Sequence, residues 1–342
     1  MEGIFSQLNM FELHEFLFDL PQQPRLLRRG MFERLDLADR LRYNDARLRY
    51  IESDFIVATP ELNGAISTVN TVQKRNTHRS YGRYAVLIDG PSGAGKTTTL
   101  VAAGAHMAQQ VERTDKPLVI GVEVPPRTSA KALLEEFCSR MVIEPPRRAT
   151  IGQLMQLVTG NLNALGIRRV LVDEVQHLAY LNQGSIEATN TLKSLTNKVQ
   201  ATFVYAGVDV KSSALMAGPH GKQLARRTVR EPLSTMTLAT EDEQAEWHGI
   251  IRAFEEHMGL LDHTPGALGK ESDYLFGRTS GSIGTLRNML VDSAIGAIEQ
   301  HSKALRIGAE GMTERIRRND LDQARTDLGV DLFHERRSRP AA

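Results

Sequence analysis

Residues 84–100 carry the pattern that most constrains the fold of this chain, a glycine-rich run of the form GxxxxGK[ST]. The run reads Gly90-Pro-Ser-Gly-Ala-Gly-Lys-Thr97, and the apolar, partly β-branched residues 84–88 precede it. The residues after Lys96 are compatible with a helix, so the run has the strand–loop–helix context that its motif requires. An ordinary glycine-rich turn, the alternative interpretation, would not need this context.

This loop is predicted to hold the phosphates of a nucleotide. Glycine lets backbone N–H groups converge on phosphate oxygens, and the N-terminus of the following helix adds partial positive charge. We expect Lys96 to reach the outer phosphates and Thr97 to ligate Mg²⁺. The residues expected to contact the nucleotide are Gly90, Pro91, Ser92, Gly93, Ala94, Gly95, Lys96, Thr97 and Thr98.

A second motif, Val170-Leu-Val-Asp-Glu174, is an apolar run that ends in two acids. In a nucleotide hydrolase Asp173 would hold Mg²⁺ through water, and Glu174 would take the proton of the attacking water. Alone, such a pair is a weak signal that also fits a solvated strand end. Here it follows Lys96 at a spacing that leaves room for one intervening strand and its helices, so we favour the catalytic interpretation.

The order of the expected elements predicts an α/β fold. Apolar runs at residues 84–88, 118–124, 170–172 and 201–207 predict strands that alternate with helices, and a short fifth strand is expected after the basic segment that starts at Gln223. Such alternation implies a parallel five-stranded sheet flanked by helices, with phosphates bound at the carboxyl ends of the strands.

The pattern becomes helical from residue 240, with helices expected over 242–258, 272–278, 283–300 and 312–328. This predicts a small C-terminal helical lid after the phosphate-binding core. The domains expected are a helical, arginine-rich appendage at 1–50, the core at 51–238, the lid at 239–305, and a tail helix with a basic end at 306–342.

Composition narrows the class of protein. The 342 residues are 41% hydrophobic and 24% charged, which is ordinary for a soluble chain with a sizeable core. No apolar run approaches the ~18–20 residues of a membrane span, and the N-terminus lacks the pattern of a signal peptide, so a cytoplasmic location is expected. Cys138, the single cysteine, takes an inward position in a helical pattern, which favours a core role and excludes a disulfide.

The net charge of +1 gives no global attraction to nucleic acid, but the basic residues are unevenly placed. Arginines crowd residues 25–49 and 315–339, and Lys74, Arg75, Arg79 and Arg83 precede the first strand without an acid. A genome that favours arginine codons, with these side chains on solvated faces, explains the clusters as well as a binding surface does.

With both nucleotide motifs placed, residues 47–328 resemble the TniB-type ATPases of transposons, AAA+ proteins related to the TnsC regulators that choose insertion targets. Besides the two motifs, the second of which continues to Leu178, the resemblance rests on Thr191-Leu-Lys-Ser-Leu-Thr-Asn197, Gln223-Leu-Ala-Arg-Arg227 and Gly281-Ser-Ile-Gly-Thr-Leu-Arg287. The first two motifs are specific only to the wider ATPase class. The last three, in this order, indicate the transposition branch.

The resemblance implies that Arg227, or its neighbour Arg226 or Arg230, reaches the nucleotide of the next subunit as an arginine finger. A surface arginine that pairs with a phosphate or carboxylate is the alternative. Arg287 matches the sensor-2 position that touches the γ-phosphate in related ATPases, and a salt-bridged helix arginine is the alternative there.

One departure from the family concerns sensor 1, the small polar residue that usually follows the fourth strand and orients the attacking water. Here Gly207 is followed by Val208 and Asp209. Either Asp209 substitutes for it, or hydrolysis is slow. For the histidines His177 and His220, ordinary polar roles are favoured over metal binding, because neither has a partner at ligand spacing.

The resemblance also implies contact with DNA from a loop near the sheet, for which the candidate is Pro126-Arg-Thr-Ser-Ala-Lys131. Arg127 and Lys131 are basic, and Thr128 can donate to a phosphate oxygen. Alternatively, Thr128 caps the following helix and Arg127 is solvated. Binding through the backbone of duplex DNA would be independent of sequence and would weaken with salt.

These observations lead to one main hypothesis, an AAA+ ATPase that uses ATP and Mg²⁺, oligomerises on duplex DNA as a ring or filament, and regulates target-site selection by a transposase. A target-selector protein is a further expected partner. The alternatives are a nucleotide-gated signalling or scaffold ATPase in phage defence or toxin regulation, and an ATPase that resembles a helicase loader or replication initiator.

Overall fold

The computed structural model describes residues 3–113, 115–178, 183–210, 225–309 and 311–324. The chain divides into two compact units, each built from two stretches of sequence. Unit 1 comprises Met1–Leu20 and Pro60–Ser234, and unit 2 comprises Pro21–Thr59 and Thr235–Ala342. The segment 1–50, expected from the sequence as one appendage, is thus divided between the two units.

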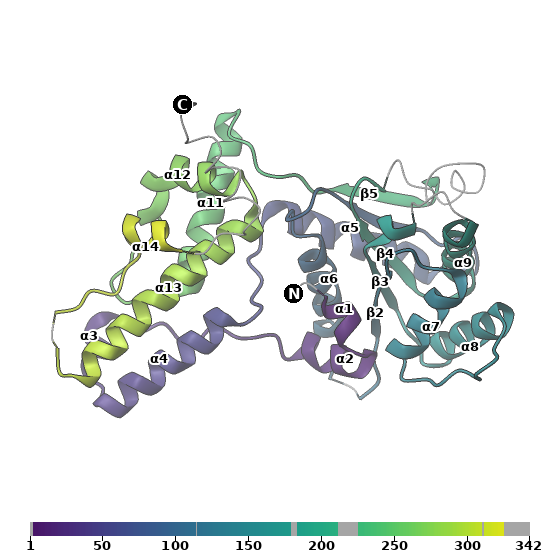
Figure 1. The fold of residues 1–342 in the computed structure, drawn as a ribbon, viewed down its shortest axis with the longest axis horizontal. Helices are drawn as coiled ribbons and strands as arrows, with labels where there is room; N and C mark the ends of the chain where they lie inside the picture. The colour runs from purple at the N-terminus through teal and green to yellow at the C-terminus, as the bar shows by residue number, and fades with distance from the viewer. Residues whose placement is uncertain (1–2, 114, 179–182, 211–224, 310, 325–342) are drawn as a thin grey trace, which may run out of the picture. The chain divides into compact units, whose positions relative to one another are not determined.

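Unit 1 is built on a parallel sheet whose five described strands have the order β2-β3-β4-β1-β5 (Figure 1). The strands are β1 (Ala85–Asp89), β2 (Val119–Glu123), β3 (Arg169–Asp173), β4 (Thr202–Gly207) and β5 (Thr228–Pro232). The predicted five-stranded parallel sheet is confirmed. Because the strands are parallel, their carboxyl ends meet at one edge, where the glycine loop follows β1 and Glu174 follows β3.

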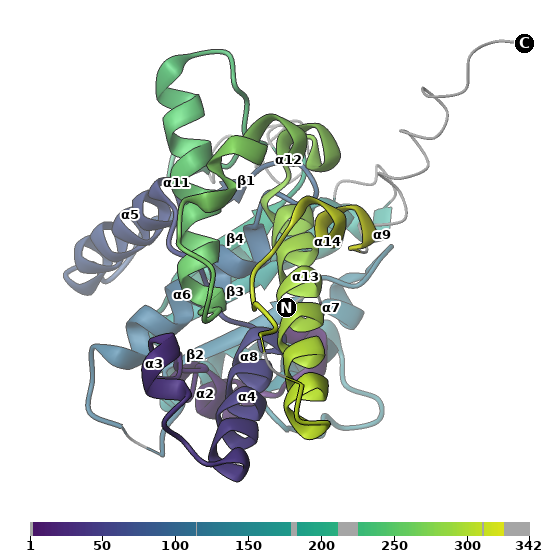
Figure 2. The same cartoon turned by 90° about the vertical axis from the view of Figure 1, so that its left-hand side faces the viewer.

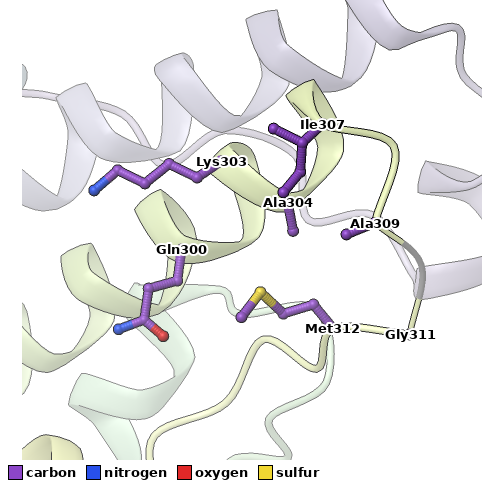
Figure 3. A pocket seen from close by; sticks show the side chains of 7 residues that line it. All are labelled: Gln300, Lys303, Ala304, Ile307, Ala309, Gly311 and Met312. Carbon is purple, nitrogen blue, oxygen red and sulfur yellow. The ribbon is translucent and has the colours of Figure 1, made fainter.

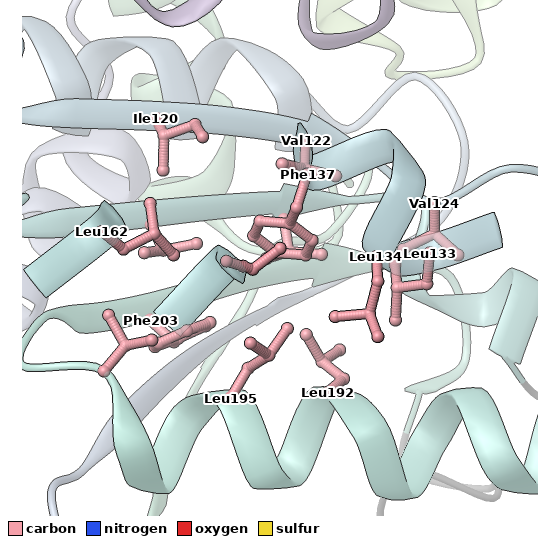
Figure 4. Packing of buried hydrophobic residues seen from close by; sticks show 14 of the residues in the cluster. Ile120, Val122, Val124, Leu133, Leu134, Phe137, Leu162, Leu192, Leu195 and Phe203 are labelled. Atoms are coloured by element: carbon pink, nitrogen blue, oxygen red, sulfur yellow. The ribbon is translucent and has the colours of Figure 1, made fainter. Parts of the chain in front are cut away.

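Helices cover both faces of this sheet. On one face lie α7 (Ala130–Arg140), α8 (Ile151–Ala164) and α9 (Gln183–Lys198). Figure 4 shows Phe137 and Leu195 from these helices packed near Val122 and Phe203 of the sheet. Cys138 is buried in the same cluster, as the sequence predicts. The other face is covered by α5 (Pro60–Thr77) and α6 (Lys96–Gln109).

The helices α1 (Ile4–Gln7) and α2 (Met10–Phe18) belong to unit 1 because they pack against β2 and α6. The ring of Phe5 lies over Gly121, where a Cβ atom would come within 2.0 Å of the ring. Leu17 contacts the helix surface at Gly104 in the same way. The N-terminal residues therefore extend the covering of the sheet, and burial of their apolar side chains keeps them there.

Unit 2 is helical in its described residues. It contains α3 (Arg29–Phe32), α4 (Leu37–Glu52), α11 (Glu241–Met258), η3 (Ala267–Glu271), α12 (Ser272–Thr279), α13 (Ile283–Arg306) and α14 (Arg318–Gln323). Figure 2 shows α13 beside α4, and the two helices pack together with α11 around buried residues such as Trp247 and Leu286. No helix in the described ranges is long and apolar enough to cross a membrane.

A buried ion cluster joins the two sequence stretches of unit 2. Arg47 of α4 donates from both terminal nitrogens to the carboxylate of Glu314, and both side chains are almost fully buried. His301 Nδ1 lies 2.9 Å from the same carboxylate, and the N–H of Leu261 donates to it. Burial alone would raise the pKa of Glu314, but the neighbouring His301 ring, the hydrogen bonds from Arg47 and the Arg47 charge lower it to about 2.

This cluster explains why the helix predicted over residues 312–328 is wrong in its first part. Residues 312–317 are not helical, and α14 begins only at Arg318. The N–H of Glu314 donates to Asp262 Oδ2 at 2.7 Å while its side chain enters the cluster. A long-range ion pair therefore overrides the local preference for helix.

Candidate functional site

The glycine loop between β1 and α6 has the backbone that the motif predicts. Gly93 and Gly95 have φ of +77° and +83°, a region that glycine enters without a steric penalty. A Cβ atom on Gly90 would lie 2.4 Å from the carbonyl oxygen of Leu233, so only glycine fits there. The N-cap of α6 is Gly95, so no side chain caps the first N–H groups of this helix, and these groups can bind an anion.

Lys96, the first residue of α6, lies across this loop and is buried. Its ammonium donates to the carbonyl oxygen of Pro91 at 2.7 Å. Burial lowers the pKa of Lys96, while the charges of Asp173, Glu174 and Asp89 oppose the change. The acids at the ends of β1 and β3 thus stabilise the charged form of Lys96, and this ammonium places positive charge at the loop.

Thr97 and Asp173 meet at the same edge of the sheet. Thr97 Oγ1 donates to Asp173 Oδ2 at 2.6 Å, and the N–H of Glu174 donates to Asp173 Oδ1 at 2.9 Å. Burial raises the pKa of Asp173 to about 6, although both hydrogen bonds act to lower it. A buried carboxylate beside a hydroxyl offers the oxygen ligands that Mg²⁺ prefers, and a cation would stabilise its charged form. The two residues therefore fit the Mg²⁺ site predicted from the sequence.

Glu174 directly follows β3 and has a φ of 57°, which is uncommon for a residue other than glycine. Its carboxylate accepts a hydrogen bond from Gln176 Nε2. The ring of His177 lies between this carboxylate and the end of β2. Its Nε2 is 3.8 Å from Glu174 Oε2, and its Nδ1 is 2.7 Å from the carbonyl oxygen of Val124. Gln176 belongs to the acidic motif, but its residue type alone indicates no role for it in the reaction.

The segment after β4 is held by Asp89, the last residue of β1. The N–H of Val210 donates to Asp89 Oδ1 at 3.1 Å, and Arg230 Nη2 donates to Asp89 Oδ2 at 2.6 Å. Arg230 is thereby engaged in an ion pair inside its own chain. Of the three arginines considered for the finger, it is the one that already has a carboxylate partner in the described structure.

Arg226 and Arg227 are exposed and lie just before β5. The register of β5 with β1 pairs Thr228 with Ala85 and Pro232 with Asp89. Arg227 is therefore at the amino edge of the sheet, about 20 Å along the strand direction from the start of the glycine loop at Gly90. Its guanidinium lies against Gly82, where Cζ would be 3.4 Å from an added Cβ atom. An arginine side chain does not span that distance within one subunit.

Arg287 lies on α13, and its described contacts are within unit 2. Its Nη2 donates to the carbonyl oxygen of Ser53 at 2.7 Å, and its guanidinium lies 5.0 Å from the centre of the Phe55 ring. Burial lowers the pKa of Arg287, against the charge of Asp54. The sensor-2 role expected for it stays a prediction.

The loop proposed to contact DNA differs in detail from the expectation. Ser129, not Thr128, caps α7 by accepting from the N–H of Ala132. Thr128 is only 3% exposed, so its hydroxyl does not reach a phosphate at the surface. Arg127 is exposed, and Lys131 lies 3.7 Å from Glu135. His220, the second histidine considered for a metal, lies outside the described residues.

Unit 2 also contains a pocket of about 540 Å³ near the end of α13 (Figure 3). Its described lining is mostly apolar, with Ile307 and Met312 among its side chains, and Lys303, the one charged residue among the described lining residues, is paired with Glu299. The described residues of this lining supply no acid or nucleophile, whereas the edge of the sheet in unit 1 concentrates charged groups. The candidate site is therefore the sheet edge.

Residues 78–211 match the AAA domain family. The matched segment contains the glycine loop, the acidic pair and β4. No curated protein sequence matches the chain.

Solved structures extend the likeness to most of the chain. It is similar to the ORC2 protein of Aeropyrum pernix in ADPNP–ADP complexes, with 17% identity, a TM-score of 0.57, and coverage of 85% of this chain and 74% of that one. It is also similar to the Aeropyrum pernix ORC1 protein in complex with DNA, with 16% identity, a TM-score of 0.53, and coverage of 84% of this chain and 69% of that one. A third similar structure is that of CDC6P from Pyrobaculum aerophilum, with 16% identity, a TM-score of 0.50, and coverage of 77% of this chain and 67% of that one. At these identities the likeness shows the fold, and the predicted P-loop AAA+ fold is confirmed.

Proposed function

We propose that this protein binds and hydrolyses ATP with Mg²⁺ at the carboxyl edge of its sheet. The observation that carries the proposal is the hydrogen bond of 2.6 Å between Thr97 and Asp173, because it joins the helix after the glycine loop to the acidic end of β3. In P-loop hydrolases a hydroxyl and an acid in this arrangement hold Mg²⁺. The AAA domain match over residues 78–211 supports the same reaction.

Each residue of the site has a separate role in this reaction. Backbone N–H groups of the loop bind phosphate oxygens, and Lys96 pairs with the outer phosphates. Thr97 and Asp173 would hold Mg²⁺, which when bound supplies charge neutralisation at the phosphate oxygens. Glu174 takes the proton of the attacking water as general base, so that the water can form the new bond to the γ-phosphorus as the bond to ADP breaks.

The nucleotide would be shared between two copies of the chain. Arg227 lies too far from its own glycine loop to touch a γ-phosphate there, so its contact as an arginine finger requires a neighbouring subunit. Arg226 is the alternative at the same edge, and Arg230 is disfavoured because Asp89 already binds it. Assembly into a ring or filament would therefore complete the site.

We further propose that the ATP-bound assembly lies on duplex DNA and regulates target-site selection by a transposase, with a target-selector protein as a further partner. This role rests on the resemblance of residues 191–197, 223–227 and 281–287 to transposon ATPases. Exposed Arg127 and Lys131 are the candidate contacts with the DNA backbone. A helicase loader or replication initiator is the second candidate, and the likeness to the ORC1 structure with DNA favours it.

Nucleotide binding and turnover, measured separately, test the chemistry. Lys96→Ala should lose nucleotide affinity, because the outer phosphates lose their cation. Glu174→Gln should bind ATP like the wild type but lose at least about 100-fold in kcat, since an amide does not accept the proton. Wild-type turnover by Glu174→Gln would remove Glu174 as the base.

The cellular role can be tested with the same variant. Glu174→Gln should trap the ATP-bound assembly and alter the frequency or distribution of transposon insertions in its host cell without arresting DNA synthesis. Arrest of DNA synthesis with unchanged insertion would favour the initiator instead.

A further inference from the structure

The end of β4 lacks the polar side chain that the resemblance leads one to expect there. Val208 follows the strand, and an isopropyl group neither donates nor accepts a hydrogen bond. The amide of Gln176 occupies this place instead, because its Oε1 accepts from the N–H of Val208 at 3.1 Å. The fit is close, since a Cβ atom on Gly207 would lie 2.7 Å from the same oxygen.

The other end of this amide contacts the candidate base. Gln176 Nε2 donates to Glu174 Oε2, so one side chain bridges the end of β4 and the carboxylate that follows β3. A glutamine amide carries two N–H donors, and a carboxylate has several acceptor sites. The bridge therefore fixes the orientation of Glu174 without using up its capacity to accept a proton.

The backbone that carries Gln176 is itself anchored. Gln176 belongs to η1 (Val175–Leu178), whose two end residues are fully buried. The N–H of His177 donates to the carbonyl oxygen of Glu174 at 3.0 Å, and the His177 ring contacts the carbonyl oxygen of Val124 after β2. Because η1 is held from both sides, the amide is preorganised rather than selected from many rotamers.

We infer that Gln176 is a positioning residue, which supplies the polar group missing at Val208 and orients Glu174 toward the attacking water. The inference rests on the proposed ATP hydrolysis at this site. It differs from both expectations drawn from the sequence, because neither Asp209 as a substitute nor slow turnover is needed. It also links turnover to β4, since displacement of Val208 would pull on the amide that holds the base.

The test is steady-state ATP hydrolysis together with nucleotide affinity for Gln176→Leu. Leucine is of similar length and removes both hydrogen bonds, so kcat should fall about 10- to 100-fold while affinity for an ATP analogue changes less than about twofold. Gln156→Leu is the matched control, because it makes the same replacement at an exposed position of α8 and should leave kcat unchanged.

Gln176→Glu separates positioning from structural support. A glutamate at this position keeps the length of the side chain and an oxygen that can accept from the N–H of Val208, but an ionised carboxylate cannot donate to Glu174. Its kcat should therefore fall about 10- to 100-fold, while affinity for an ATP analogue changes less than about twofold. A purely structural role, met by any polar side chain of this length, would leave kcat at the wild-type value.

The outcomes are distinguishable. Unchanged kcat of Gln176→Leu beside an active wild type would overturn the inference, and so would loss of nucleotide affinity in that variant. If Gln176→Leu does not fold, a wild-type kcat for Gln176→Glu would overturn it. Absence of hydrolysis by the wild type would instead overturn the proposed function on which the inference depends.

Discussion

Replacement of Glu314 by glutamine should destabilise unit 2 by several kcal/mol. The change removes the negative charge that Arg47 faces, and leaves a guanidinium whose side chain is 1% exposed without a counter-charge. The contacts of Glu314 lower its pKa from 4.5 to about 2. A difference of one in pKa corresponds to about 1.4 kcal/mol, so the ionised carboxylate stabilises the folded state by about 3 kcal/mol. Breaking other buried ion pairs costs a similar amount, about 3–5 kcal/mol.

Trp247 provides the assay, because it is the only tryptophan of the chain and is fully buried in unit 2. Its fluorescence during urea unfolding should report this unit, and the midpoint should fall by roughly 1–3 M urea at a slope of about 1–3 kcal/mol per molar. Glu256→Gln is the control, since Glu256 forms an exposed pair with Arg252 and its loss should cost less than about 1 kcal/mol. Equal midpoints for wild type and Glu314→Gln would refute the reasoning.

The same carboxylate predicts an acid dependence. Its pKa is lower in the folded chain than in the unfolded chain, so its contribution is complete above about pH 4.5 and is lost as the pH falls toward 2. The difference in stability between wild type and Glu314→Gln should therefore shrink across this window. Arg47 and His301, the other charged or titratable side chains that face Glu314, are present in both proteins and therefore do not account for the difference.

Three further predictions concern unit 1. Arg227→Ala should bind ATP but hydrolyse it at least about 10-fold more slowly. Mixing this variant with Lys96→Ala should restore part of the rate if the loop variant still joins the assembly. An unaltered rate for Arg227→Ala, and for the equivalent changes at Arg226 and Arg230, would exclude the finger. Arg127→Ala combined with Lys131→Ala should lower the salt slope of DNA binding by up to about 2 and weaken every duplex alike, without changing ATP affinity; an identical slope would exclude this loop. Gly90→Ala should lower thermal stability by about 1–3 kcal/mol, because the added Cβ atom meets a carbonyl oxygen at 2.4 Å, and an unshifted melting curve would contradict that geometry.

The strands and the phosphate loop could be predicted because their signals are local. Residues 84–88 are continuously apolar because both faces of β1 are covered, and the glycines of the loop are dictated by its own backbone. The acid at Asp173 could be placed beside Thr97 once the strands were taken as parallel, since their carboxyl ends meet at one edge.

Other features depend on partners distant in the sequence. The helices α1 and α2 lie in unit 1 because Phe5 packs on Gly121 of β2 and Leu17 packs on Gly104 of α6, where no side chain is in the way. No local sequence pattern reveals these contacts. The role of Gln176 depends on a backbone N–H of the segment after β4, and side-chain type alone does not specify it. Thr128 and Ser129 are both suitable caps by residue type, and only the structure shows that Ser129 caps α7 while Thr128 is buried.

The two-part construction of unit 2 has a consequence for synthesis of the chain. Arg47 precedes Glu314 by 267 residues, and α13, which packs on α4, is complete only at Arg306. At about 5–20 residues per second, a ribosome would release α4 at least about 13 seconds before its buried partner exists. During that interval the apolar face of α4 and its arginine are without their native cover. A chaperone that holds the nascent N-terminal segment should therefore raise the yield of folded protein, and Glu314→Gln should raise the demand for it.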